Sequence, residues 1–253
     1  MINVKMISEY IDSFAPYTSK CEWDNCGILV GDPLKYINKV GFTLDLTEET
    51  LEKAKELEID LIITHHPIIF KAQKNFVSGD LSYELAINSI SAISAHTCFD
   101  CAKGGVNDVL CEILDIENPE GVPCDECVVP MARIGDVSET TTKEFARKVS
   151  DKLCTVCRVV DCGKTVKRVA VCGGAGMDFI DDVIKLGADT YVTGDCSHHQ
   201  FLLEKEKGIN LIAAGHFETE NPAMLRLMDI IGAEFPDLEL HSLCQSNPVE
   251  FIG

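Results

Sequence analysis

Four apolar runs in this chain end on histidine or acidic residues, and this pattern limits the possible folds more than any other feature. The clearest run, residues 61–63, continues through one threonine into His65, His66 and Pro67. Pro67 disfavours a helical backbone at His66, so the run is typical of a buried strand that stops at the two histidines. Open α/β sheets place ligands at the carboxyl ends of their strands, although an isolated histidine pair can also cap a surface loop.

The other three runs favour a ligand-binding edge, because each is also followed by side chains that bind metals. These side chains are His96 and Asp100 after residues 90–95, His198 and His199 after 190–193, and His216 and Glu220 after 209–213. Each has a structural alternative: His96 as a hydrogen-bonding residue, Asp100 as a helix cap, and the histidine pair at 198–199 as a polar helix face. The repetition at successive strand ends indicates a site.

Strands and helices alternate along the chain, which predicts an α/β fold. Val40, Phe42 and Leu44 alternate with polar or small residues, as a strand does. Thr47 can then cap a helix, and residues 61–64 supply the strand that completes a βαβ unit. We therefore expect a two-lobed α/β protein in which each lobe is a sheet flanked by helices. No internal repeat is evident.

A change in composition at residues 118–123, which hold two prolines and a glycine, marks an expected boundary. We expect one metal-binding lobe from residues 1–122 together with 205–253, and a second lobe from residues 123–204. The C-terminal segment is assigned to the first lobe because His216 and Glu220 must reach His65 and Asp100 if these residues share ions.

The net charge argues against several classes of partner. Lys and Arg total 22 against 41 Asp and Glu, which gives a formal net charge of −19. Such a chain repels nucleic-acid phosphates and anionic membranes, and it suits a site that collects divalent cations. No apolar run reaches about 18 residues, the length that a transmembrane helix needs. We expect a cytoplasmic protein that binds a small molecule and neither nucleic acid nor membrane.

The chain has 13 cysteines, an odd number, and its sequence shows no secretion signal. We therefore expect the cysteines to be reduced thiols. Three Cys-x-x-Cys pairs occur. The second and third enclose residues 128–153, a longer gap than zinc ribbons use, and no redox-active-site context surrounds any pair. The pairs are Cys98/Cys101, Cys124/Cys127 and Cys154/Cys157. We expect the four cysteines of the second and third pairs not to form a structural zinc site.

Two further segments allow two interpretations each. The glycine-rich residues 173–176 lack the dinucleotide fingerprint and a Walker lysine, so a tight turn is favoured over an anion site at a helix N-terminus. Trp23, the sole tryptophan, precedes polar residues and a short apolar strand. A buried indole that anchors a loop is favoured over a substrate contact.

The candidate metal ligands are His65, His66, Asp100, His216 and Glu220. Mixed imidazole and carboxylate donors suit zinc, iron, manganese or nickel better than calcium. Five protein ligands exceed what one catalytic ion commonly takes, so two ions with a shared carboxylate fit better. Adjacent strand residues point in opposite directions, which favours His65 and His66 on different ions.

These segments resemble the Nif-three-like dinuclear metal protein family, whose members are often named GTP cyclohydrolase 1 type 2 homologues. The similarity runs in order across nearly the whole chain. The matching segments are Trp-Asp-Asn-x-Gly at 23–27, Asp-Leu-Thr at 45–47, Ile-Thr-His-His-Pro at 63–67, Ala-His-Thr-x-Phe-Asp at 95–100, Gly-Gly-Val-Asn-Asp at 104–108, Val-Thr-Gly-Asp-Cys-Ser-His-His at 192–199 and Ala-Gly-His-Phe-x-Thr-Glu at 214–220.

The resemblance implies a toroidal homohexamer with a dinuclear site that faces the interior, and it places the metal ligands on the same five residues. The chain lacks the inserted domain of the longer members. It also carries Cys98 and Cys101 on either side of Asp100, which puts the redox behaviour of a bound metal in question.

The function implied by the resemblance is a metal-dependent hydrolase that acts on a nucleotide-like substrate. GTP ring opening by metal-bound hydroxide is the specific reaction, with His96 or Glu218 as the group that moves the proton. The alternative is a non-catalytic metal-binding or regulatory scaffold. Glu220 is expected to be a ligand shared by both ions, although its place before Asn221 and Pro222 would also suit a carboxylate ahead of a helix N-terminus.

Overall fold

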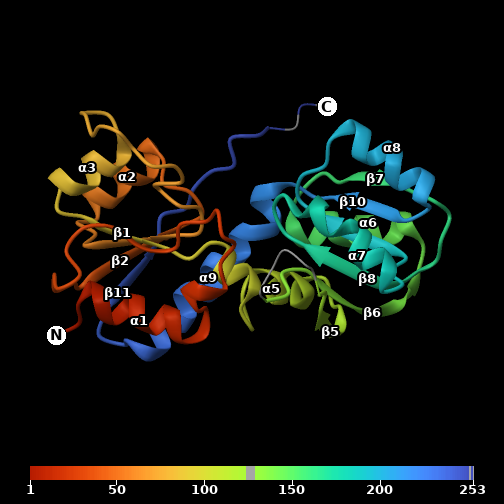
Figure 1. The fold of residues 1–253 in the computed structure, drawn as a ribbon, viewed down its shortest axis with the longest axis horizontal. Helices are drawn as coiled ribbons and strands as arrows, with labels where there is room; N and C mark the ends of the chain where they lie inside the picture. The colour runs from red at the N-terminus through yellow and green to blue at the C-terminus, as the bar shows by residue number, and fades with distance from the viewer. Residues whose placement is uncertain (124–128, 251, 253) are drawn as a thin grey trace. The chain divides into compact units, whose positions relative to one another are not determined.

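The computed structural model describes residues 1–123, 129–250 and 252 (Figure 1). The chain divides into two compact units, each described here by itself. Unit 1 holds Met1–Lys103 and Met224–Pro248, and unit 2 holds Gly104–Ala223 and Val249–Gly253. Residues 104–122 and 205–223 therefore belong to unit 2, whereas the sequence placed them in the first lobe.

Unit 1 is built on a five-stranded sheet with the order β1-β4-β3-β2-β11. The four strands from β4 to β11 run parallel, and β1 is antiparallel to β4. Pairing of β11 with β2 brings the C-terminal segment into the N-terminal sheet. The strands are β1 (Gly27–Val30), β2 (Lys39–Thr43), β3 (Leu61–Thr64), β4 (Ser91–Ser94) and β11 (Glu239–Ser242).

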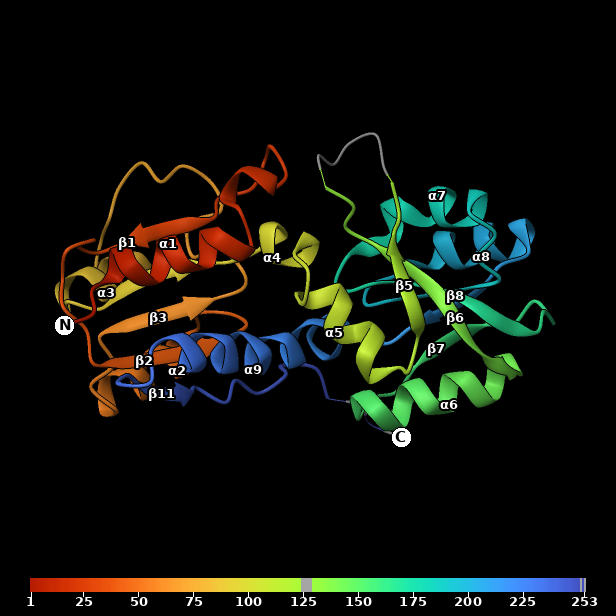
Figure 2. The same ribbon diagram turned by 90° about the horizontal axis from the view of Figure 1, so that it is seen from below.

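Helices cover both faces of this sheet. Figures 1 and 2 show α2 and α3 on one face and α1 with the C-terminal part of α9 (His216–Glu234) on the other. Thr47 caps α2 through a reciprocal pair of hydrogen bonds with Thr50, which confirms the predicted cap. The helical segments of unit 1 are α1 (Val4–Phe14), η1 (Tyr17–Ser19), α2 (Glu48–Glu56), α3 (Leu81–Ile87) and α4 (Thr97–Cys101).

Unit 2 is built on a six-stranded sheet with the order β5-β6-β8-β9-β10-β7. Strands β8, β9 and β10 are parallel, whereas β6 and β7 run antiparallel to their neighbours. A buried cluster that includes Phe145, Val149, Val169 and Ile212 joins α6 to this sheet. The strands are β5 (Glu117–Gly121), β6 (Arg133–Thr140), β7 (Arg158–Val160), β8 (Val166–Cys172), β9 (Thr190–Thr193) and β10 (Asn210–Ala213).

Helix α6 of unit 2 starts with a capping box, and the last helix starts earlier than predicted. Thr141 and Glu144 form the capping box of α6. The final helix was predicted to start at Pro222, but it starts at His216 and contains Pro222. Gly215, with φ of +92°, turns the chain, and Thr219 N–H already donates to the Gly215 carbonyl. The helical segments are α5 (Val106–Ile113), α6 (Thr142–Leu153), η2 (Gly176–Phe179), α7 (Ile180–Lys185), α8 (His198–Lys207) and α9 (His216–Glu234).

The two units repeat one arrangement that the sequence did not reveal. In each sheet three successive parallel strands are followed by an antiparallel edge strand, in the orders β2-β3-β4-β1 and β8-β9-β10-β7. An aspartate before the second strand binds the backbone of the first in both units. Asp60 accepts from the N–H groups of residues 38 and 39, and Asp189 accepts from those of residues 167 and 168. The two units can have the same backbone pairing with few side chains in common, so the sequence does not reveal the repeat.

No helix in the described part of the chain is long and apolar enough to span a membrane.

Candidate metal centre

Three imidazoles gather at the carboxyl ends of β3 and β4 in unit 1. His65 and His66 follow β3, and His96 follows β4 by two residues. Ring centroids lie 5.1 Å apart for His65 and His66, 5.1 Å for His65 and His96, and 5.4 Å for His66 and His96. One ring nitrogen of each lies within 4.8 Å of those of the other two, close enough for one metal ion to bind all three.

Each of these imidazoles is oriented through Nδ1. The Ala95 carbonyl lies 2.8 Å from Nδ1 of His65, and because a carbonyl only accepts, this nitrogen carries the proton. Carboxylates hold Nδ1 of His66 (Asp45, 2.6 Å) and of His96 (Asp24, 2.8 Å). A proton on Nδ1 leaves Nε2 with the lone pair, so Nε2 is the nitrogen that can bind a metal.

Asp24 is the most extensively bonded of the supporting residues. Its side chain is buried and accepts hydrogen bonds from His96, from both the N–H and the hydroxyl of Thr97, from Cys26 and from Asn25 N–H. Burial alone would raise the pKa of Asp24, but the bonds from His96, Thr97 and Cys26 hold that pKa well below its usual range. Asp24 therefore stays charged while it is hydrogen-bonded to Nδ1 of His96.

Asp45 is itself held by the C-terminal segment. Gln245 Nε2 donates to Asp45 Oδ2 (2.8 Å), and Gln245 Oε1 accepts from Asp45 N–H (2.7 Å). The orientation of His66 therefore depends on a residue about 180 positions further along the chain, a contact that no local sequence pattern predicts.

Asp100 joins the same cluster from α4. Its Oδ1 lies 3.5 Å from Nε2 of His65, and both residues are buried. Unit 1 thus brings together four of the predicted site residues: His65, His66, His96 and Asp100.

Unit 2 brings together the other two predicted ligands. His216 and Glu220 lie one turn apart on α9, with Nε2 of His216 3.1 Å from Oε2 of Glu220. Asp195, which follows β9, lies 2.7 Å from Nδ1 of His216. Burial favours the neutral imidazole, but the hydrogen bonds to Asp195 and Glu220 raise the pKa of His216 to about 10. Asp195 was not assigned from the sequence, although its place after a strand could have indicated it.

Gly174 makes room for this pair. A β-carbon at Gly174 would lie 2.0 Å from Oε1 of Glu220 and 3.1 Å from Nε2 of His216, and its φ of +59° also favours glycine. Gly174 N–H donates to Thr219 Oγ1, and its carbonyl accepts from the N–H of Asp195. The glycine turn predicted at 173–176 is therefore the wall of the ligand pair in unit 2.

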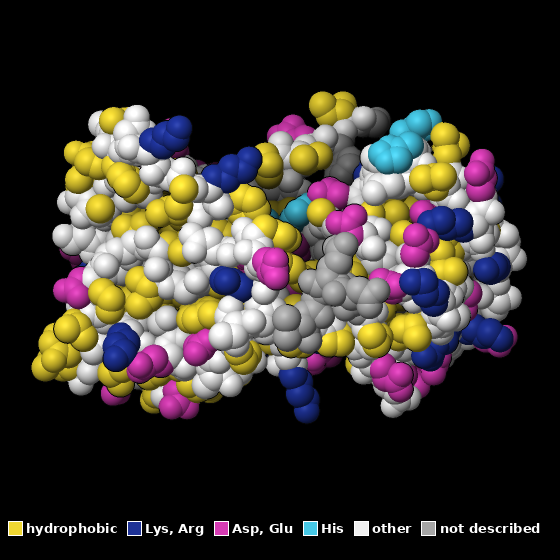
Figure 3. All heavy atoms as spheres, viewed as in Figure 1, with side chains coloured by type: hydrophobic (Ala, Val, Ile, Leu, Met, Phe, Trp, Pro, Cys, Tyr) yellow, Lys and Arg dark blue, Asp and Glu magenta, His cyan; other side chains and the backbone are white. Residues whose placement is uncertain are grey.

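The remaining candidates lie elsewhere or take other roles. The carboxylate of Glu218 faces the backbone of Gly215 and lies near Cys157, whose pKa is raised to about 11 by burial and by that charge. His198 and His199 are exposed on α8, where Figure 3 shows histidine side chains at the surface, so the polar helix face is the better interpretation. Cys124 and Cys127, two of the four cysteines in the prediction of no structural zinc, lie outside the described residues.

Trp23 was predicted to be a buried anchor, and this prediction is wrong. The indole is 59% exposed, whereas the carboxylate of the next residue, Asp24, is fully buried. The hydrogen bonds of Asp24, which the sequence does not show, fix the loop and leave the indole outside.

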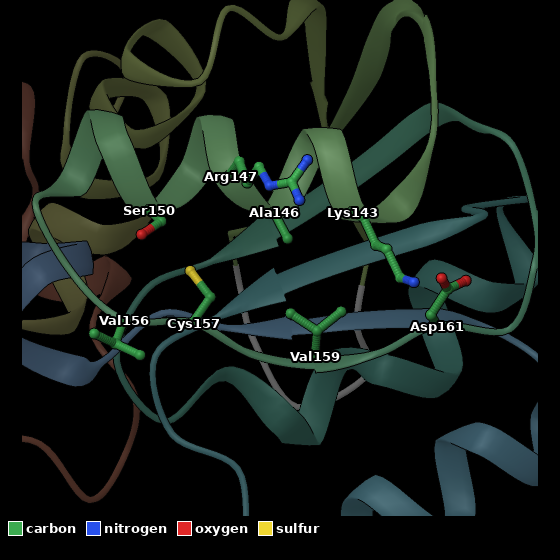
Figure 4. A pocket seen from close by; sticks show the side chains of 8 residues that line it. All are labelled: Lys143, Ala146, Arg147, Ser150, Val156, Cys157, Val159 and Asp161. Atoms are coloured by element: carbon green, nitrogen blue, oxygen red, sulfur yellow. The ribbon is translucent and has the colours of Figure 1, made fainter. Parts of the chain in front are cut away.

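A depression of about 410 Å³ on unit 2 lies between α6 and β7 (Figure 4). Its wall holds two cations, Lys143 and Arg147, and Lys143 faces Asp161 across it. None of the predicted site residues lines it, so we assign no role to it.

The donor set in each unit fits a transition metal. Unit 1 offers three Nε2 atoms and a carboxylate, and unit 2 offers one imidazole and one carboxylate in a space that a β-carbon would fill. Imidazoles whose Nδ1 binds a carboxylate or carbonyl are the usual form of metal-binding histidine. These residues are therefore able to bind divalent ions such as zinc or iron.

Comparisons with known proteins agree with this fold. The family model described as Duf34/NIF3 (NGG1p interacting factor 3) matches residues 2–248. A Clostridium perfringens protein named "GTP cyclohydrolase 1 type 2 homolog" is 35% identical, over 97% of this chain and 98% of its own. Reduced HcgD from Methanocaldococcus jannaschii is 32% identical with a TM-score of 0.84, covering 96% and 98% of the two chains.

A hypothetical protein from Staphylococcus aureus shares the fold alone, at 24% identity and a TM-score of 0.90 over 99% of both chains. With nearly the whole chain matched by the family model, the resemblance and the α/β fold predicted from the sequence are confirmed. The chain belongs to the Duf34/NIF3 family.

Proposed function

We propose that this protein is a metal-dependent hydrolase that acts on a nucleotide-like substrate. The name of the Clostridium perfringens relative suggests GTP ring opening as the specific reaction. The observation that supports the proposal most is the cluster of His65, His66 and His96, in which each Nδ1 is bound and each Nε2 can bind a metal or take a proton. Metal-binding histidines ordinarily donate their second ring N–H to a carboxylate or a backbone carbonyl, and all three imidazoles have such a partner.

The proposed ligands of two divalent ions are His65, His66, Asp100, His216 and Glu220. Zinc, iron, manganese and nickel all suit imidazole and carboxylate donors. When bound, such ions lower the pKa of water and polarise a substrate carbonyl or ring.

His96 is the proposed proton-handling residue. Asp24 holds its Nδ1, so that Nε2 accepts a proton and the carboxylate stabilises the imidazolium that forms. Glu218 is the weaker candidate, because its carboxylate lies against the backbone of Gly215.

Metal analysis followed by a turnover assay tests the function. Freshly purified protein should contain a divalent transition metal, and protein loaded with that metal should convert GTP or a related nucleotide. His65→Ala should lose turnover by at least about a hundredfold, since it removes a buried ligand. His199→Ala, on the exposed face of α8, is the matched control and should keep full activity. Tight metal binding without turnover on a broad nucleotide and phosphoester panel would instead favour the regulatory scaffold.

Glu220→Gln tests the shared ligand. Glu220 is 5% exposed and is the fifth residue of α9, so it does not precede the helix N-terminus as the sequence suggested. The amide keeps the size of the side chain but removes its charge. Metal content should fall from about two ions per chain to one or none, with the fold intact.

Elemental analysis and circular dichroism measure the two effects. Glu234→Gln, at the exposed end of the same helix, is the control and should retain all metal. A Glu220→Gln protein that keeps two ions at unchanged affinity would contradict the shared-ligand assignment.

The assembly and location also stay proposals. We propose a toroidal homohexamer in the cytoplasm, and light scattering of the purified chain would measure the number of subunits.

A further inference from the structure

Two aromatic side chains are exposed beside the histidine cluster of unit 1. Trp23 is 59% exposed and Phe70 is 49% exposed. Their ring centroids lie 5.6 Å apart, and those of Trp23 and Phe70 lie 5.8 Å and 6.5 Å from that of His96. The two rings and His96 therefore form one continuous aromatic surface.

The exposure of these rings is built into the loops that carry them. Asn25 Nδ2 donates to the carbonyl of Ile69 (2.7 Å), which ties the loop of Trp23 to the loop of Phe70. Asp24 fixes the same loop to His96 and Thr97. The backbone beside each ring is therefore held by hydrogen bonds. The two large apolar rings, which a fold ordinarily buries, are nevertheless exposed to solvent.

The chemistry around the rings indicates the kind of ligand. Exposed aromatic faces stack on planar bases with little regard to sequence or substituents. Lys71 and Lys74 follow Phe70 in the same loop, and neither forms an ion pair with any residue that the structure describes. In a chain of net charge −19, such lysines offer an anionic ligand a local place to bind.

We propose that Trp23 and Phe70 form a stacking platform for the planar heteroaromatic ring of a nucleotide-like substrate. Because the platform adjoins His96, a stacked ring lies next to the residue proposed to move the proton. This inference rests on the proposed function and adds to it the part of the substrate that is recognised.

Trp23 is the sole tryptophan, so its fluorescence reports on this surface alone. The full-length, metal-free protein is titrated with GMP and, separately, with ribose 5-phosphate, which lacks the ring. GMP should quench the emission in a saturable way and ribose 5-phosphate should not. Equal effects of the two probes, or no saturable change with GMP, would overturn the platform.

Variants test the second ring. Phe70→Leu should weaken GMP binding about tenfold, as loss of one stacking partner does. Phe76→Leu is the matched control, since Phe76 is 55% exposed in the same loop and has no ring contact with His96 among the described residues. Equal losses in the two variants would overturn the proposal.

Calorimetry of Trp23→Phe and Trp23→Leu completes the test. GMP binding should survive in Trp23→Phe and fall about tenfold in Trp23→Leu. Emission that changes with protein concentration in the absence of ligand would show that the rings cover a subunit contact, and would overturn the platform.

Failure of the platform and failure of the proposed function are distinguishable. Nucleotide turnover that is unchanged in Trp23→Leu would reject the platform and leave the hydrolase. Saturable, ring-dependent quenching in a protein without turnover on any nucleotide would support the platform and reject the hydrolase.

Discussion

Gly174→Ala is expected to abolish metal binding by the His216 and Glu220 pair. The new β-carbon would lie 2.0 Å from Oε1 of Glu220, so that carboxylate must rotate away from His216. The backbone φ of +59° adds strain of about 1 kcal/mol. Metal content measured by elemental analysis should fall by at least one ion per chain, while the protein stays folded.

Gly187→Ala is the control that separates the backbone strain of a positive φ from the steric clash with Glu220. Gly187 has a φ of +84° but nothing within 4 Å of the β-carbon position, so this variant carries a similar backbone cost without touching a ligand. It should lose about 1 kcal/mol of stability and keep its metal. If the two variants retain the same amount of metal, Gly174 is not the wall of the ligand pair.

Asp24→Asn is expected to give the largest loss of stability, about 3 kcal/mol in urea unfolding of the metal-free protein. The buried carboxylate accepts hydrogen bonds from His96, Thr97 and Cys26. The asparagine amide has one acceptor oxygen where the carboxylate has two. Its NH₂ group would therefore face hydrogen-bond donors and leave them without an acceptor. Asp12→Asn, at an exposed carboxylate that accepts one bond from Tyr17 N–H, should stay within about 1 kcal/mol of the parent.

The pH dependence of that difference has a definite sign. The pKa of Asp24 is lowered in the folded protein, so the carboxylate stabilises the fold at pH values above its unfolded pKa of about 3.9. The stability gap between parent and Asp24→Asn should be constant near neutral pH and shrink as the pH falls below about 4. A gap that widens in acid would contradict the role of the charged carboxylate.

Most of what the sequence could predict about the fold and the candidate site came from residues at the ends of strands. Hydrophobic runs and capping residues are local signals, so the positions of β3 and α2 and the histidines after β3 followed directly from them. Long-range hydrogen bonds are not local, and so the supporting residues Asp24 and Gln245 were not identified from the sequence.

The same limit explains the errors. Trp23 was predicted to be buried because it lies just ahead of a short apolar strand, but the hydrogen bonds of Asp24 and Asn25 to distant loops decide its exposure. The start of α9 was predicted at Pro222 because proline favours first helical turns. The turn at Gly215 starts that helix earlier.

The order of strands in the two sheets has a consequence for synthesis on the ribosome. The strands that the structure describes in the unit 2 sheet lie between residues 117 and 213, so that sheet can be completed before β11 is synthesised. In unit 1, β11 (Glu239–Ser242) pairs with the edge of β2 that β3 leaves open. Until those residues leave the exit tunnel, the nascent N-terminal sheet carries an open edge that can pair with another chain. The N-terminal sheet is therefore the last to be finished, and termination before Glu239 removes the strand that covers the edge of β2.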